Sequence, residues 1–255
     1  MSSSAHLIRQ TCRAVFRALT AERPAVILVR QGCKRIVADR VTLDIPQGTI
    51  GVLPANTPLQ IENVPQNGRY IASALMPSDD VLAAADLPHG HPHRTTRHDR
   101  TVGAFERAVA ALDDPLTPER LRAHAMGEVL LWLAEDGIGF GPVRPARFAD
   151  HLRARLARDL AAPWRSVDAA RDMAVSEATL RRRLSSDGTT FGDLLADVRM
   201  THALALLQST DLPVNRIALD VGYASASRFA TRFRARFGVA PSAIRKGNIA
   251  GQPVT

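Results

Sequence analysis

The sequence predicts an α+β protein with two domains, a small β-barrel or sandwich first and an all-α domain with two helix-turn-helix motifs last. Residues 24–76 contain short apolar runs separated by turn signals, a pattern typical of barrels and sandwiches. Residues 147–248 have only helical patterns, and two short helix pairs recur there about 49 residues apart. Positive charge is concentrated in the same part, with 17 Arg or Lys against 10 Asp or Glu, whereas residues 1–146 hold 16 against 15. Two domains explain both changes, and the basic one is expected to meet phosphate.

The first domain is expected to consist of short strands. We place strands at 25–30, 35–38, 41–45 and 49–53, with turns at 46–48, 54–56 and 66–68. Alternation along the first strand places Val26, Leu28 and Arg30 on one face and Ile27 and Val29 on the other. Residues 4–20 are expected to form a helix or an amphipathic lead-in, because their apolar residues are only loosely periodic.

A polar, histidine-rich stretch at 86–100 precedes two predicted helices, at about 101–113 and 117–135. Thr117 is expected to cap the second helix, because Pro118 and an acidic first turn follow it. An apolar stripe along that helix is wide enough to be buried against a partner. It consists of Leu121, Ala125, Val129 and Trp132, with Leu130 and Leu133 beside it. A homodimer interface in the 101–135 region and packing onto the chain's own barrel both explain the stripe.

These patterns divide the chain into four segments. We expect a sensor or effector domain at 1–85, a linker and helical dimerisation region at 86–142, a DNA-binding domain at 143–248 and a tail at 249–255. The two helix-turn-helix motifs are placed at about 164–186 and 213–237.

The first helix-turn-helix consists of helices at 166–173 and 176–186, separated by a tight break. Ser166 and Ser176 are the predicted N-caps, because a serine hydroxyl can accept a hydrogen bond from the first turn. The residues expected to face inward are Val167, Ala170, Met173, Leu180 and Leu184. Three consecutive arginines, 181–183, include side chains on the outer face of the second helix, as expected of a helix that enters the DNA major groove.

The second helix-turn-helix repeats this form at 214–221 and 225–237, with Ser225 as the predicted cap. The residues expected to face inward are Ile217, Ala218, Val221, Phe229, Phe233 and Phe237. A long helix at 191–209 would hold the two motifs apart, so that two recognition helices roughly 34 Å apart enter successive major grooves on one face of the DNA.

The motif residues resemble the AraC/XylS family of bacterial transcription regulators over roughly 147–248. The likeness rests on Ala170…Met173…Ser176…Leu180…Arg182, Gly188-x-x-Phe191, Arg199…Ala203…Leu206-Leu207, Ile217-Ala218…Gly222-Tyr223, Ser225…Ser227-x-Phe229…Phe233…Phe237-Gly238 and Pro241-Ser242-x-x-Arg245. The resemblance implies DNA contacts from Ala178, Arg181 and Arg182 in the first recognition helix and from Ser227, Arg228 and Thr231 in the second. The full candidate set is Ser176, Ala178, Thr179, Arg181, Arg182, Arg183, Ser225, Ser227, Arg228, Thr231, Arg232 and Arg234.

This chain departs from the family pattern at two of those positions. Ala178 is small where the family often has a large or polar residue, and Thr231 stands where the family commonly has Arg, which here follows at Arg232. The two recognition helices are still expected despite these departures. What changes is the set of bases that each helix is expected to contact.

The stretch from Leu43 to Pro58 is similar to the cupin-like effector domains of many AraC-type regulators. We therefore expect a cupin-like β-barrel that binds a small effector. Basic side chains could bind an anionic effector such as a fatty acid or a nucleotide second messenger, the alternative being exposed strand residues without a ligand. The candidates are Arg30, Lys34, Arg35, Arg40 and Arg69.

We expect no metal, cofactor or enzymatic activity. Metal-binding cupins need barrel histidines, and residues 24–76 contain none. His89, His91, His93 and His98 alternate in an extended segment that could hold Zn²⁺ or Ni²⁺, but the prolines and polar residues around them favour a solvated linker. No nucleophile–base constellation and no glycine-rich phosphate loop is present. A barrel enzyme with a DNA-binding appendage and a charge-driven, non-specific DNA binder are the alternatives to a regulator.

The N-terminus lacks the basic start and apolar run of a secretion signal, and no apolar stretch reaches the ~18 residues of a membrane span. We therefore expect a cytoplasmic protein that does not bind membranes and whose Cys12 and Cys33 stay unpaired. The expected function is a ligand-responsive homodimer that binds double-stranded promoter DNA.

Overall fold

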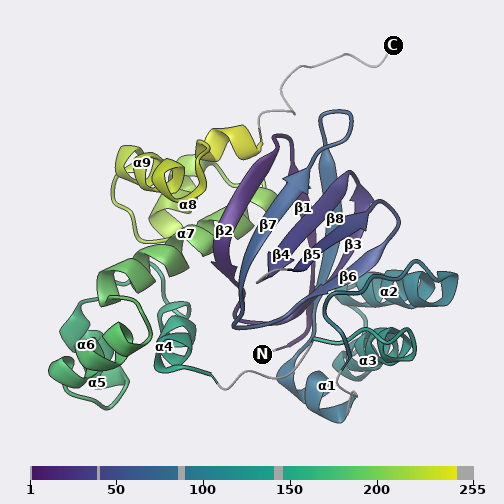
Figure 1. Cartoon of the computed structure of the whole chain (residues 1–255), viewed down its shortest axis with the longest axis horizontal. Coiled ribbons are helices and arrows are strands. Elements are labelled where there is room, and N and C mark those ends of the chain that lie inside the picture. The colour runs from purple at the N-terminus through teal and green to yellow at the C-terminus, as the bar shows by residue number, and fades with distance from the viewer. Residues whose placement is uncertain (1, 39–40, 86–89, 141–145, 246–255) are drawn as a thin grey trace. The chain divides into compact units, whose positions relative to one another are not determined.

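The computed structural model describes residues 2–38, 41–85, 90–140 and 146–245, which form two compact units. Of the described residues, the first unit contains 2–38, 41–85 and 90–140 together with Arg245, and the second contains 146–244. Figure 1 shows that the strands belong to the first unit and that the second is made of helices. The predicted α+β fold class, with strands first and helices last, is confirmed.

Eight strands build the first unit. They are β1 (Ser4–Gln10), β2 (Ala14–Thr20), β3 (Ala25–Gln31), β4 (Cys33–Ala38), β5 (Val41–Pro46), β6 (Ile50–Leu53), β7 (Pro58–Val64) and β8 (Tyr70–Met76). One antiparallel sheet has the order β1-β8-β3-β6 and the other the order β2-β7-β4-β5. This is the order of a jelly roll, the double-sheet architecture of the cupins. The cupin-like character expected from one stretch of sequence therefore extends to the whole strand topology.

Residues 4–20 form β1 and β2, so the expectation of a helix or lead-in there is wrong. β1 pairs with β8 and β2 pairs with β7, both antiparallel. These partners come much later in the chain, so long-range pairing decides the conformation and local periodicity does not. In β2 the register also shifts between Phe16 and Leu19, where Ala18 has a φ of 49°. Such a bulge disrupts the alternation by which a strand is identified in sequence.

Strand β3 is buried on both faces. Val26 and Leu28 belong to an apolar cluster that includes helix residues. Ile27 and Val29 belong to a second cluster, built only from strands of the two sheets. The alternation predicted along this strand is confirmed, and its double burial explains why the segment is a continuous apolar run.

Three helices accompany the sheets: α1 (Asp79–Ala84), α2 (Asp99–Asp113) and α3 (Glu119–Glu135). Figure 1 shows α2 and α3 close to β3 and β6, and Phe105 of α2 and Met126 of α3 are fully buried in one cluster with Val26. The two helices predicted at 101–113 and 117–135 are confirmed. Pro118 occupies the N-cap position of α3, whereas the Thr117 hydroxyl donates to Asp114 Oδ2 at 2.7 Å, so the predicted Thr117 cap is wrong.

The apolar stripe of α3 is divided between two environments. Val129, Leu130 and Leu133 are buried in the cluster shared with β3, so this part packs onto the chain's own jelly roll. Leu121 of the stripe is 58% exposed, and so is Leu131, which lies outside it, at 57%. Helix periodicity identified the buried face, and only the exposed leucines are left for another partner.

Asp136, at the end of α3, fixes the segment that leads into α2. Its carboxylate accepts hydrogen bonds from the hydroxyls of Thr96 and Thr101, each at 2.7 Å, and lies 2.7 Å from Nδ1 of His98. Burial opposes ionisation, but hydrogen bonds from Thr101, Thr96 and His98 lower the pKa of Asp136 to about 2. His98 therefore belongs to a structural cluster.

The second unit contains α4 (Phe148–Leu156), α5 (Ser166–Asp172), α6 (Glu177–Ser186), α7 (Phe191–Ser209), α8 (Val214–Asp220), α9 (Ala226–Phe237) and a 3₁₀ turn at Pro241–Ile244. Each helix predicted for this region is present to within a few residues. Across the described ranges, no helix combines the length and apolar character that crossing a membrane requires.

Two details of the first helix-turn-helix differ from expectation. Arg165, not Ser166, precedes the first turn of α5, and the Ser166 hydroxyl instead donates to Glu177. Val167 is 38% exposed and Ala169 is fully buried beside Ala170. Because α5 has only seven residues, its periodicity is too short to determine which face is buried.

Candidate nucleic-acid interface

The first candidate recognition helix, α6, is anchored by its apolar face and by its cap. Leu180 and Leu184 are 1% exposed and pack among residues of α4, α5 and α7. The Ser176 hydroxyl accepts a hydrogen bond from the Thr179 backbone N–H at 3.2 Å, which confirms the predicted cap. Of the predicted contact residues in this motif, Thr179 is half-buried. The others are exposed; they are Ser176, Ala178, Arg181, Arg182 and Arg183.

Within that set the arginines differ. The Arg183 guanidinium lies 5.2 Å from the centre of the Phe148 ring, so this side chain also covers α4. Arg181 lines a groove between α6 and the start of α7. Arg182 is exposed.

The second candidate recognition helix, α9, is anchored in the same way. Phe229, Phe233 and Phe237 are buried, with ring centroids 5.7 and 4.8 Å apart along the stripe. The Ser225 hydroxyl accepts from the Arg228 backbone N–H at 3.3 Å, as predicted for the cap. The remaining predicted contact residues are exposed; they are Ser227, Arg228, Thr231, Arg232 and Arg234.

Both helix pairs turn through a residue with positive φ. It is Ala174 in the first motif, with φ 51°, and Gly222 in the second, with φ 83°. The second turn has one more residue, Ala224, before its cap. The left-handed conformation reverses the chain tightly, which is why the two helices of each motif can cross closely.

Helix α7 connects the two motifs. Its 19 residues correspond to a length of about 28 Å at 1.5 Å per residue. Near its middle, Asp197 accepts hydrogen bonds from Arg153 of α4, at 2.8 Å, and from Arg236 of α9, at 2.9 Å. Since α4 packs against both α6 and α7, this half-buried carboxylate links the supports of both recognition helices. Sequence reasoning missed it, because nothing in the spacing shows which elements meet.

Of the predicted effector residues, Lys34 of β4 is the one inside the jelly roll. It is 3% exposed, and its Nζ donates to Asn63 Oδ1 at 2.7 Å. The same nitrogen lies 5.3 Å from the centre of the Tyr70 ring. Burial lowers the pKa of Lys34 to about 7. The Tyr70 hydroxyl is also buried and has no hydrogen-bond partner among the residues that the structure describes.

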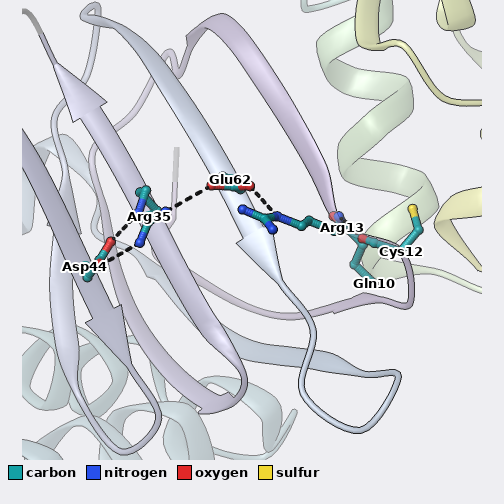
Figure 2. A network of polar contacts seen from close by, with 6 residues as sticks. All are labelled: Gln10, Cys12, Arg13, Arg35, Asp44 and Glu62. Carbon is teal, nitrogen blue, oxygen red and sulfur yellow. Dashed lines mark hydrogen bonds and ion pairs between the residues drawn. The ribbon is translucent and has the colours of Figure 1, made fainter.

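The other predicted effector residues do not gather around Lys34. Arg30 forms a two-pronged ion pair with Glu106 of α2, with both N–O distances at 2.8 Å. Arg35 binds Asp44 and lies 3.6 Å from Glu62 on a neighbouring strand, in a network that Figure 2 shows reaching Arg13. Arg69 is exposed in the turn before β8, and Arg40 lies outside the described residues.

No group of three or more His, Cys, Asp or Glu side chains suited to a metal occurs in the described part of the chain. Of the four histidines considered, His89 lies outside that part. Cys12 and Cys33 are free thiols, and burial raises the pKa of each.

Two capped helix pairs, each with a buried apolar stripe and an exposed arginine-rich face, define a double helix-turn-helix DNA-binding unit. Residues 169–247 match the family described as a helix-turn-helix domain. The second unit is therefore a DNA-binding domain of the AraC type, as the sequence motifs predicted.

Known transcription regulators match part of this chain. YdeO of Shigella flexneri is 40% identical over 87 residues, which are 34% of this chain and 34% of that protein. The activator FapR of Escherichia coli is 34% identical over 100 residues, 39% of this chain and 38% of its own. These matches span little more than a third of each relative's length.

The whole chain resembles ToxT from Vibrio cholerae in structure. The match covers 95% of this chain and 97% of the ToxT chain, with a TM-score of 0.65 and 15% identity. ToxT bound to (E)-4-(8-methylnaphthalen-1-yl)but-3-enoic acid matches with a TM-score of 0.64 and 15% identity, and the match covers 95% of this chain and 97% of the ToxT chain. ToxT bound to an unsaturated fatty acid matches with a TM-score of 0.63 and 14% identity, and that match covers 94% of this chain and 92% of the ToxT chain. At this level of identity the likeness shows a shared fold.

Proposed function

We propose that this chain is a sequence-specific transcription regulator of the cytoplasm that binds promoter DNA through α6 and α9 and responds to a small ligand in its jelly roll. The observation that best supports this proposal is the pair of serine-capped helices, α6 and α9, which α7 connects within one domain. Catalysis has no part in this proposal. The domain layout expected from the sequence fits it, with effector domain, helical region and DNA-binding domain in that order.

On DNA, the two recognition helices would enter successive major grooves. Exposed side chains at the start of each helix would reach base edges, and arginines beside them would bind phosphates. Ala178 offers only a methyl group, which suits contact with a thymine methyl. Arg182, exposed and without the aromatic contact that holds Arg183, is the strongest candidate in α6 for reading a base.

Replacing Arg182 with alanine is expected to weaken binding to the specific duplex by about 1–3 kcal/mol, while binding to a scrambled duplex changes little. Arg171→Ala is a matched control, because Arg171 is exposed on α5, outside the recognition helix, and the same charge is removed. Fluorescence anisotropy on both duplexes at several salt concentrations measures the effect. Equal losses on both duplexes would make Arg182 a phosphate contact, and wild-type protein with no sequence preference would identify a charge-driven binder.

A fragment of residues 144–255 is expected to fold and to bind the specific duplex, because the second unit has its own apolar core. Circular dichroism establishes whether the fragment is helical, and anisotropy measures its binding. A folded fragment that binds no DNA would contradict the assignment of DNA binding to this domain.

We propose further that the ligand is a carboxylic acid with an apolar tail, bound through Lys34. An interior lysine without a carboxylate partner in the described residues is costly, and an anion would offset that cost. The unpaired Tyr70 hydroxyl could donate to the same carboxylate. Both ToxT ligands named above are carboxylic acids, which supports this class. Such a ligand would regulate DNA binding only if it bound two arrangements of the domains unequally.

A homodimer is the remaining part of the proposal, with the exposed leucines of α3 as its contact. Leu121→Arg together with Leu131→Arg is expected to shift the protein from dimer to monomer in sedimentation velocity, because two exposed leucines that the proposed interface would bury become charges. Arg120→Glu, a change in charge at an exposed neighbour, is the control. An unchanged sedimentation coefficient in the double variant would exclude α3 as the interface.

A further inference from the structure

A cavity of about 470 Å³ lies between α7 and α9, within the DNA-binding domain. Three arginines line it: Arg199 from α7, and Arg228 and Arg232 from α9. Its wall also includes Gly222 of the second turn and Gly192 of α7. Gly192 lines the groove beside α6 as well, so the two depressions meet on α7, between the two recognition helices.

The charge of this cavity is not compensated. Arg199, Arg228 and Arg232 form no ion pair with any carboxylate in residues 146–245. Other arginines of the domain do pair: Arg153 and Arg236 share Asp197, and Arg216 binds Asp220 at 2.8 Å. Three unpaired guanidinium groups at one cavity repel one another unless an anion lies among them.

Arg199 is held in place without being neutralised. Its Nε donates to the carbonyl oxygen of Leu160 at 3.1 Å, and its Nη2 to that of Ala162 at 2.8 Å. The guanidinium lies 5.9 Å from the centre of the Tyr223 ring. Carbonyl oxygens and an aromatic face orient the cation but carry no net charge, so its positive field stays directed at the cavity.

We propose that this cavity binds a phosphate group of the DNA backbone, on the strand that passes between the two major grooves. The inference rests on the proposed function, and it assigns to Arg228 and Arg232 a phosphate in place of a base. Arg199, which the sequence motifs did not suggest as a DNA contact, becomes the third ligand. Guanidinium groups match phosphate in shape and charge, and a contact of this kind positions the protein without reading sequence.

The test is Arg232→Gln in the full chain, with Arg216→Gln as the control that removes one charge elsewhere. Both positions are exposed, so both variants should fold. Arg232→Gln is expected to lower the slope of log K against log salt by about 0.9 and to weaken binding about five- to tenfold at 0.1 M salt, equally on specific and scrambled duplexes. Arg216→Gln is expected to change neither quantity by a comparable amount.

A scan of duplexes with single methylphosphonate linkages identifies the phosphate. At one position the neutral linkage should weaken the wild type and not weaken Arg232→Gln further, and Arg199→Gln should show the same non-additivity. Additive losses at every position, or an unchanged salt slope, would overturn the proposal. A thermal shift with inorganic phosphate that depends on Arg232, without any effect on DNA binding, would assign the cavity to a free anion and overturn it too. Wild-type protein that binds no DNA at all would instead refute the proposed function.

Discussion

Replacing Gly222 with alanine is expected to destabilise the DNA-binding domain by more than about 3 kcal/mol, because the new Cβ has no room and the backbone conformation opposes it. A Cβ at this position would lie 2.5 Å from the carbonyl oxygen of Leu160 and 2.6 Å from Nη2 of Arg199, and φ is +83°. The carbonyl belongs to the backbone and cannot rotate away. Urea unfolding followed by circular dichroism measures the loss, and specific DNA binding should fall with it.

The equivalent turn of the first motif provides the matched variant, with the opposite sign. Ala174 has a φ of 51°, a conformation that alanine adopts at a cost and glycine does not. Ala174→Gly is therefore expected to stabilise the domain by up to about 1 kcal/mol, partly offset by the greater freedom of glycine in the unfolded chain. If Gly222→Ala were tolerated, or if both variants shifted the urea midpoint in the same direction, the proposed roles of the two turns would be wrong.

The DNA-binding domain could be predicted closely because its signals are local. Serine caps, i, i+4 leucines and the phenylalanine stripe all act within a few turns of helix, and these features locate α6 and α9. The same reasoning placed the candidate DNA-contact residues on the faces opposite the buried stripes, where all but half-buried Thr179 and Ser225 are exposed. It was least accurate for α5, because seven residues give too short a pattern. The buried residue there is Ala169, whereas Val167 was the one predicted to be buried.

Features that depend on chain topology could not be predicted in this way. β1 and β2 become strands through partners near the end of the jelly roll. The carboxylate of Asp197 matters because α4 and α9 both reach it. The sequence alone does not distinguish the five basic residues proposed for an effector, whereas the structure separates buried Lys34 from paired Arg30 and Arg35. Alternation along β4, where Ile36 is also buried, was the one signal in the sequence that indicated an inward Lys34.

Replacing Lys34 with methionine is expected to stabilise the protein by roughly 1–4 kcal/mol near pH 7, because a methionine of similar length removes a buried cation that has no carboxylate partner in the described part of the chain. The same buried lysine should make the stability of the wild-type protein depend on pH. Lys34 has a pKa of about 7 in the folded protein and near its ordinary value of 10.5 when unfolded. Between these values the unfolded chain binds more protons, so wild-type stability should rise with pH from about 7 to 10 and stay level below 7 with respect to this group. Thermal unfolding across this range should show the rise in the wild type and its absence in Lys34→Met.

Arg35→Met is the control for this experiment, because Arg35 adjoins Lys34 on β4 but points to the opposite, exposed face. Its partner Asp44 has a pKa lowered by the hydrogen bond from Arg35, so its titration lies in acid. Burial raises the pKa of the neighbouring Cys33 thiol and Arg35 lowers it, so the two variants are compared between pH 7 and 8, below the range in which that thiol titrates. A carboxylate ligand should also reduce the cost of the buried charge, by pairing with the Lys34 ammonium group. By pairing with protonated Lys34, oleate should raise the unfolding temperature of the wild type and flatten its pH dependence, and should do neither in Lys34→Met. If oleate stabilised both proteins equally, its carboxylate would lie elsewhere, and the cost of burying Lys34 would then have to be explained by the fold alone.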